Sequence, residues 1–274
     1  MILAINWTEA QIEEIVKKVV IEMNGTPSDI PAYDAESYGG RKFIGIFEDM
    51  NDAIEAANAG YRAIRSMRVE EREKLITSIR ELIHKEADIL GALGVAETKM
   101  GRVAHKIAKH HLVADKTPGT EDIVSEVKTG DYGLTLTEMA PFGVVGSITP
   151  STNPSETVLC NSMGMIAAGN GIVFNPHPNA IATSNYAVDL VNRACFAAGG
   201  PKILVASVKK PTLDTANIMY KSPLIRLLVC TGGPGVVKAV LSSGKKESAY
   251  HAKKETYKQP QKETAGIVRP PRRK

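Results

Sequence analysis

The chain has 274 residues, 43% hydrophobic and 23% charged, a balance typical of a soluble protein with room for one large domain or two small ones. No apolar run approaches the roughly 18 residues that cross a bilayer, so we expect no membrane span. The net charge of +4 arises at the end of the chain, because residues 245–274 carry +7 and the rest carry −3. The basic balance is therefore no argument that the folded body binds nucleic acid.

The cysteines and histidines predict neither disulfides nor a metal site. The three cysteines, Cys160, Cys195 and Cys230, are far apart, odd in number and form no CxxC pair, which fits a reducing cytosol. The apolar start of the chain has no basic flank, which argues against a secretory signal and for a cytoplasmic protein. The adjacent His110 and His111 would point about 100° apart on a helix, so we expect a solvated pair rather than shared metal ligands.

The N-terminal segment reads as a short amphipathic helix followed by a linker. Thr8 and Gln11 have the spacing of a capping box, and an apolar stripe then runs to Met23 at helical spacing. Glycine and proline mark residues 25–42 as a linker. From the pattern alone, two interpretations stay open: the stripe packs on its own domain, or it is an address recognised by another protein.

The next hundred residues predict helices and one hairpin. Helical periodicity covers 51–67, 69–93 and 102–113. Alternating residues on either side of Gly130 predict a β-hairpin with strands at 124–128 and 132–138.

From Gly143 onward the pattern alternates regularly between apolar strands and helices. Strands are predicted at 144–149, 172–174, 203–205 and 225–230, and helices at 155–168, 178–196, 212–220 and 235–241. Strands that are apolar throughout and alternate with helices form a parallel sheet covered on both faces. The predicted fold class is therefore α/β, with a doubly wound parallel sheet.

A ligand site is expected where these strands end. Polar residues or glycines stand there, at 149–153, 175–177 and 231–235. Glycine lets backbone N–H groups approach a phosphate, and the following helix N-terminus adds partial positive charge. Asn153 could donate a hydrogen bond to an oxyanion, or it could be a turn or cap residue, which spacing alone favours.

Several motifs stand in a specific order along the chain. They are Glu97-Thr98-Lys99-Met100-Gly101, Pro141-Phe142-Gly143-Val144-Val145-Gly146, Pro150-Ser151-Thr152-Asn153-Pro154, Ala167-Ala168-Gly169-Asn170, Phe174-Asn175-Pro176-His177-Pro178, Thr231-Gly232-Gly233-Pro234-Gly235 and Ser243-Gly244-Lys245-Lys246. Together they resemble the CoA-acylating aldehyde dehydrogenases, in particular the acetaldehyde and propionaldehyde enzymes of bacterial microcompartments. The resemblance covers about residues 43–246, with lysine at position 99 where the family usually has glycine.

The resemblance implies roles for individual residues. Residues 43–246 would form an NAD-binding domain of the Rossmann-like type, and Asn153 would support the oxyanion. The residues expected to bind the cofactor are Thr149, Pro150, Ser151, Thr152, Asn175, Pro176, His177, Thr231, Gly232 and Gly233. Between the third strand and the following helix, Lys209 and Lys210 could meet a 2′-phosphate of NADP, although a solvated pair is the simpler interpretation.

The family reaction oxidises a short-chain aldehyde to an acyl-CoA, with NAD as cofactor and coenzyme A as co-substrate. It needs a cysteine thiolate. In the family this cysteine lies in a separate catalytic domain, and none of the three cysteines here matches it, so we expect the chain to be inactive alone. The alternative is a non-catalytic cargo fragment or nucleotide-binding remnant.

The resemblance also implies partners. Residues 124–139 resemble a hairpin that joins subunits into a homo-oligomer. Residues 1–24 resemble the encapsulation peptides of microcompartment enzymes, so residues 8–23 would contact a shell protein.

The segment 247–274 departs from the family and has little apolar periodicity, so we expect a disordered tail. Two origins stay open, a frameshift near codon 246 and a genuine basic tail that binds an anionic surface.

Overall fold

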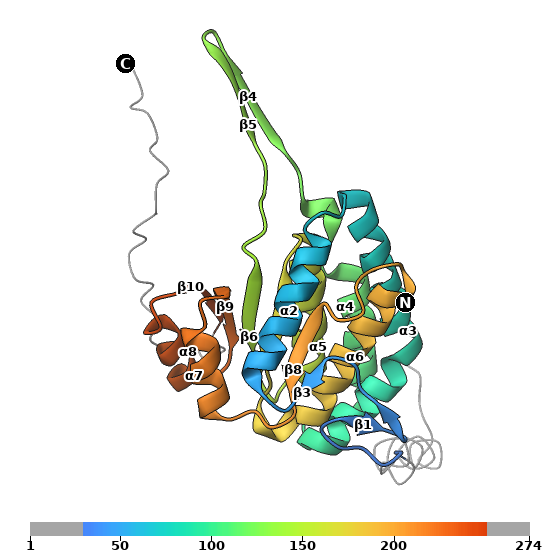
Figure 1. Cartoon of the computed structure of the whole chain (residues 1–274). Coiled ribbons are helices and arrows are strands. Elements are labelled where there is room, and N and C mark those ends of the chain that lie inside the picture. Colours follow the sequence, from blue (N-terminus) through green and yellow to red (C-terminus); the bar gives the residue numbers. More distant parts are fainter. Residues whose placement is uncertain (1–29, 251–274) are drawn as a thin grey trace, which may run out of the picture.

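The computed structural model describes residues 30–250, so the predicted helix at 8–23 and residues 251–274 lie outside the described part. A six-stranded sheet runs in the order β10-β9-β6-β7-β8-β3 (Figure 1). Its strands are β3 (Ile46–Phe47), β6 (Val144–Ile148), β7 (Gly171–Asn175), β8 (Val205–Val208), β9 (Ile225–Thr231) and β10 (Lys246–Tyr250). All neighbouring pairs are parallel, which confirms the predicted fold class.

Helices cover both faces of the sheet. On one face pack α2 (Met50–Ile64), α7 (Leu213–Lys221) and α8 (Pro234–Leu241). On the other lie α5 (Pro154–Ala167) and α6 (Ile181–Ala197), with α3 (Val69–Thr98) packed over both and α4 (Val103–Lys116) beside α3. Every residue of β6, β7 and β8 is buried, as expected for strands covered on both sides. No helix in the described range is long and apolar enough to cross a membrane.

The helices form largely where the apolar periodicity places them, with one instructive difference. Helix α3 runs five residues beyond the predicted end, to Thr98, and ends because Lys99 adopts the left-handed conformation with φ 57°. Glycine takes this conformation without steric cost, so a glycine at this position would also end the helix. Thr212 begins α7 as predicted, because its hydroxyl accepts a hydrogen bond from the amide of Thr215 at 3.1 Å.

Three segments differ from the sequence-based expectation. The third strand lies at Val205–Val208 rather than 203–205, because the side chain of Asn192 accepts hydrogen bonds from the amides of Leu204 and Val205 and fixes the entry to the strand. The predicted linker contains a short antiparallel pair, β1 (Ser37–Tyr38) and β2 (Arg41–Lys42). Shortly after this pair, Ile46 and Phe47 form β3, an unexpected strand at the edge of the sheet next to β8.

The boundary at residue 247 also needs correction. We expected a disordered tail from there, but residues 247–250 belong to β10, which pairs with β9 from Lys246↔Leu227 to Tyr250↔Thr231. Backbone hydrogen bonds to a neighbouring strand do not depend on side-chain pattern, so a segment without apolar alternation can still extend a sheet.

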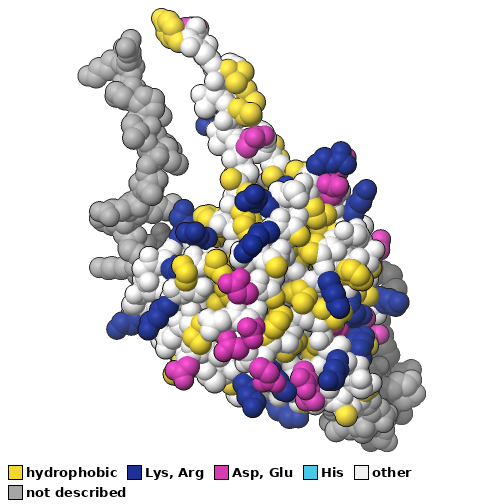
Figure 2. Space-filling model, in the orientation of Figure 1, with side chains coloured by type: hydrophobic (Ala, Val, Ile, Leu, Met, Phe, Trp, Pro, Cys, Tyr) yellow, Lys and Arg dark blue, Asp and Glu magenta, His cyan; other side chains and the backbone are white. Residues whose placement is uncertain are grey.

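A hairpin projects away from the body (Figure 1). It consists of β4 (Glu126–Gly130) and β5 (Gly133–Thr137), and all its residues are exposed. Val127 pairs with Leu136 and Thr129 with Leu134, so these residues share one face. Figure 2 shows hydrophobic side chains along this projecting arm.

Candidate functional site

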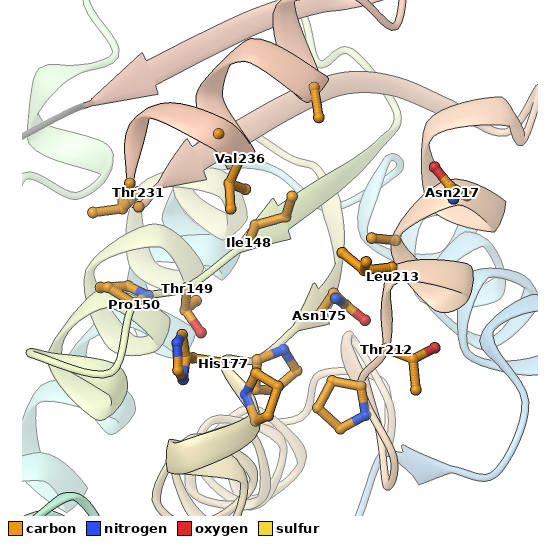
Figure 3. Close-up of a pocket in the computed structure, with 18 of the residues that line it drawn as sticks. Ile148, Thr149, Pro150, Asn175, His177, Thr212, Leu213, Asn217, Thr231 and Val236 are labelled. Carbon is orange, nitrogen blue, oxygen red and sulfur yellow. The ribbon is translucent and has the colours of Figure 1, made fainter.

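A cavity of about 650 Å³ opens where β6, β7 and β9 end, between these strands and helices α7 and α8. Figure 3 shows Thr231 and Val236 on one side of it and Asn175 and Thr212 on the other. Ligands of open parallel sheets bind at this edge, and the volume lies in the range of small-molecule sites, about 300–1,000 Å³.

Most of the residues predicted to bind the cofactor line this cavity. They are Thr149, Pro150, Asn175, Pro176, His177, Thr231, Gly232 and Gly233. Ser151 and Thr152 do not line it, because the turn after β6 carries them away from the cavity; Thr152 is exposed and its carbonyl accepts a hydrogen bond from Lys106 Nζ at 2.7 Å.

Sequence reasoning missed the helical walls of the cavity. Helix α7 contributes Leu213, Ala216, Asn217 and Tyr220, and helix α8 contributes Val236 and Ala239. Burial raises the pKa of Tyr220 to about 12, so its phenol stays neutral. The spacing of 213, 216, 217 and 220 is the one available signal, because it places these residues on one face of the helix.

The polar side chains that line the cavity differ in their hydrogen-bond partners. Thr149 Oγ1 is buried without a hydrogen-bond partner among the described residues. Asn175 Oδ1 accepts a hydrogen bond from Thr215 Oγ1 at 2.7 Å. His177 Nδ1 accepts one from the amide of Asn179 at 3.1 Å. Buried polar atoms are normally satisfied, so Thr149 marks a position where a polar ligand group fits.

The glycine turn leaves backbone exposed at the start of α8. Gly233 is the N-cap of α8, and a Cβ built on Gly233 or Gly235 would meet no atom within 4 Å. Packing therefore does not require glycine at these two positions. The absence of side chains instead leaves the helix N-terminus open to an anionic group.

Asn153 lies in a second cavity of about 410 Å³ beside the first, and Thr231 lines both. Its Oδ1 accepts a hydrogen bond from Lys109 Nζ at 3.0 Å and a longer one from Lys106 Nζ at 3.4 Å. Ammonium groups only donate, so the amide oxygen faces the lysines and the amide nitrogen is left as a donor. Asn153 is also the N-cap residue of α5, although its side chain makes no cap hydrogen bond.

A buried polar network supports this second cavity. Lys106 Nζ contacts Glu156 Oε1 at 2.8 Å, and both side chains are less than a tenth exposed. His110 donates from Nδ1 to the Lys106 carbonyl at 2.7 Å, and its Nε2 lies 2.9 Å from Ser155 Oγ. Burial is the largest effect on His110 and lowers its pKa.

The expected solvated histidine pair is therefore wrong for His110, which is fully buried. Lys106, His110 and Ala114 are the buried residues of α4, at the i, i+4 spacing of one face. His111 instead lies against His84 of α3, with their Nδ1 atoms 2.8 Å apart. Among the described residues, no group of three or more His, Cys, Asp or Glu side chains could hold a metal ion.

The cysteines are poorly suited to nucleophilic attack. Burial raises the pKa of Cys195 to about 12 and that of Cys230 to about 11. Cys160 lines the second cavity, but burial raises its pKa too, against a smaller opposing effect of its hydrogen bond to Thr117. Thiols in such surroundings stay protonated near neutral pH, and the thiolate is the reactive form.

Comparison with known proteins places the chain in a family. Residues 45–256 match the aldehyde dehydrogenase family. The chain is 44% identical over 231 residues to the acetylating acetaldehyde dehydrogenase EutE of Escherichia coli, covering 84% of this chain and 47% of the relative. It therefore spans about half the length of the curated relatives it matches.

Solved structures similar to this one include two propionaldehyde dehydrogenases. A propionaldehyde dehydrogenase from the fucose utilisation microcompartment of Clostridium phytofermentans has a TM-score of 0.73 and 56% identity, covering 74% of this chain and 47% of that one. A propionaldehyde dehydrogenase of Rhodopseudomonas palustris with bound CoA and an acylated cysteine has a TM-score of 0.73 and 45% identity, over 75% and 47% of the two chains. This chain belongs to the aldehyde dehydrogenase family.

Proposed function

We propose that this chain binds NAD as the nucleotide-binding part of a CoA-acylating aldehyde dehydrogenase acting on a short-chain aldehyde. The observation that carries the proposal is the cavity at the ends of β6, β7 and β9, which collects eight of the residues that the family resemblance assigns to the cofactor. The relatives named above are an acetylating acetaldehyde dehydrogenase and propionaldehyde dehydrogenases, which supports the same substrate class.

The residues of the cavity fit a dinucleotide. The open glycine turn at the start of α8 would hold the pyrophosphate, and the apolar faces of α7 and α8 would hold the adenine. The unsatisfied hydroxyl of Thr149 offers a hydrogen bond to a ribose or phosphate oxygen. When bound, NAD supplies the hydride acceptor for oxidation of the aldehyde.

Asn153 would stabilise the oxyanion formed when the aldehyde carbon is attacked. Its amide nitrogen is left as a donor by the two lysines, and its cavity adjoins the dinucleotide cavity at Thr231. None of the three cysteines of these 274 residues is suited to supply the attacking thiolate, because all are protonated and buried or half-buried. We propose that the chain binds cofactor but forms no acyl-CoA alone.

Calorimetric titration of the full chain with NAD⁺ tests the proposal, alongside an assay for acyl-CoA formed from propanal, NAD⁺ and coenzyme A. A useful variant is Gly233→Val, because a Cβ at this position would meet no atom within 4 Å and the branched side chain would occupy the open turn. We expect binding by the parent chain, loss of binding with an unchanged melting temperature in the variant, and no acyl-CoA from either. Absence of NAD⁺ binding by the parent would refute the dinucleotide site, and acyl-CoA formation would refute the inactivity.

We further propose that the hairpin joins copies of this chain into a homo-oligomer. Its apolar face carries Val127, Leu134 and Leu136, each more than half exposed. The double variant Leu134→Ser, Leu136→Ser should reduce the mass measured by light scattering without changing the melting temperature. An unchanged mass would assign the association to another surface.

The encapsulation proposal rests on residues 8–23, outside the described part. A reporter fused to residues 1–24 should enter microcompartments in cells that make them, which would place the protein inside a cytoplasmic shell. A diffuse reporter would contradict both the shell contact and the location.

A further inference from the structure

We propose that the cavity also accepts adenosine nucleotides that carry a 2′-phosphate, held by the Asn175 amide nitrogen and the His177 Nε2 atom. The inference rests on the proposed function, because it needs a dinucleotide in this cavity. It adds that the site does not select against the phosphorylated cofactor.

The position of the adenosine ribose follows from the two ends of the cavity. The turn before α8 is the place for the pyrophosphate, and the slot between α7 and α8 is the apolar place for adenine. The ribose that joins them must lie against the remaining wall, which is formed by the end of β7 and by Pro211 and Thr212. In doubly wound dinucleotide folds, the residue that reads the ribose 2′-hydroxyl also lies near a strand end.

The amide of Asn175 presents a donor to this position. Asn175 is buried, and its Oδ1 is engaged by the hydroxyl of Thr215 at 2.7 Å. Because the oxygen of the carboxamide is used in this way, the group that remains is the NH₂, which can only donate. A donor serves either a hydroxyl lone pair or a phosphate oxygen.

The imidazole of His177 presents a second donor. Its Nδ1 accepts a hydrogen bond from the amide of Asn179 at 3.1 Å, so the proton of the neutral ring is on Nε2. The ring lines the cavity and is half-buried. Two donors at one strand end suit an anion, because hydrogen bonds from N–H groups to phosphate oxygens are strengthened by the charge.

No carboxylate lines the cavity among the described residues. Selective NAD sites commonly place an acidic side chain against the 2′-hydroxyl, which both accepts its proton and repels a phosphate. Here that selection is absent. The carboxylate of Asp214 is exposed in the first turn of α7 but does not line the cavity.

The nearby lysines do not account for the site. Lys209 pairs with Glu48 at 2.8 Å and with Glu36 at 3.2 Å, and it does not line the cavity. Lys210 is exposed and does not line it either. The sequence-based alternative, a lysine that meets the 2′-phosphate, is therefore replaced by the pair Asn175 and His177.

The test compares two nucleotide ligands, each a fragment of the dinucleotide, that differ only at the ribose 2′ position. Titration calorimetry of the full chain with 5′-AMP and with 2′,5′-ADP, at one ionic strength, gives the ratio of their dissociation constants. We expect the two constants to agree within about tenfold, because both ligands meet donors. NAD⁺ and NADP⁺ are then compared in the same way.

Two variants and a control assign the contact. Asn175→Asp keeps an acceptor for Thr215 but faces the ribose with a carboxylate, so it should weaken 2′,5′-ADP relative to 5′-AMP by at least about tenfold. His177→Ala should shift the ratio in the same direction by a smaller factor. The double variant Lys209→Ala, Lys210→Ala should leave the ratio as in the parent.

The outcomes separate the two proposals. A parent chain that binds 5′-AMP but binds 2′,5′-ADP over about 100-fold more weakly would overturn the inference and leave the NAD site standing. A ratio that changes in the lysine variant and not in Asn175→Asp would also overturn it. If neither fragment nor either dinucleotide binds, the proposed function fails and the inference fails with it.

Discussion

His110 is held without charge in the interior, with Nδ1 donating to the Lys106 carbonyl and Nε2 beside Ser155 Oγ. Burial lowers its pKa, so the folded protein binds this proton less readily than the unfolded chain, where the pKa is about 6.5. The stability from this residue is complete above that value and is lost as the pH falls through the folded-state pKa. The loss is at most about 1.4 kcal/mol per pH unit.

Thermal melts between pH 7.5 and 5 check this prediction. The parent chain should lose more of its melting temperature over this range than His110→Gln, which keeps hydrogen-bonding groups but does not titrate. Equal losses in the two proteins would mean that other groups set the acid sensitivity.

The ion pair of Lys106 and Glu156 is a second residue-scale feature, with Nζ and Oε1 2.8 Å apart and both side chains nearly excluded from water. Removing one partner leaves a buried charge, so Lys106→Met should lower the free energy of unfolding by about 3 to 5 kcal/mol. The double variant Lys106→Met, Glu156→Leu should recover part of that loss. Urea titrations measure both. A double variant less stable than the single one would contradict the stranded-charge explanation.

Some residues of the two cavities can be predicted from the sequence, and others cannot. Thr149, Asn175 and Thr231 could be predicted because parallel strands end at a common edge, which follows from the strand pattern alone. Lys106 and Lys109 could not, because they reach Asn153 from a helix more than 40 positions earlier. Only the packing of α4 against α5 brings them together.

At the scale of elements, helix α2 packs closely against the loop before β8 at Gly60. A Cβ on Gly60 would overlap the carbonyl oxygen of Ile203 and lie 2.9 Å from Leu204 Cα. Glycine is normally unfavourable inside a helix by about 0.5–1 kcal/mol relative to alanine. At Gly60 we expect the opposite, with glycine more favourable than alanine, because the backbone atoms in contact cannot move aside as a flexible side chain can.

The matched control is Gly164 within α5, where a Cβ would meet nothing within 4 Å. We expect Gly60→Ala to destabilise by about 1–3 kcal/mol and Gly164→Ala to be neutral or stabilising by up to about 1 kcal/mol. Chemical denaturation of the two variants measures the difference. Similar effects of both substitutions would show that the close approach of α2 to the loop before β8 is not limiting.

The element pattern also explains which parts of the fold the sequence predicts. Helices α2 and α7 and strands β6, β7 and β9 follow from long apolar periodicity or from caps such as Thr212. Strands β3 and β10 do not, because they are edge strands that are short or only lightly buried. Edge strands form through backbone pairing with a neighbour already in place, and this pairing leaves a weak trace in the sequence.

At the scale of the whole molecule, one sheet edge serves both cavities. Thr231, at the end of β9, lines the dinucleotide cavity and the cavity of Asn153. The order of the strands therefore determines how close the proposed cofactor lies to the proposed oxyanion donor. Any change that disturbs β9 should affect both sites together.

Strand β10 protects that arrangement by covering the free edge of β9. Without it, β9 would present unpaired N–H and C=O groups along Leu227–Thr231, which is a template for pairing with another chain. A chain ending at Lys245 should therefore be less soluble than one ending at Thr256, where the family match ends, and should bind NAD⁺ more weakly. Sedimentation velocity and titration of the two chains check this. A shortened chain that stays monodisperse and binds NAD⁺ as the longer one does would show that β9 needs no cover, and that residues 246–256 contribute nothing to NAD⁺ binding.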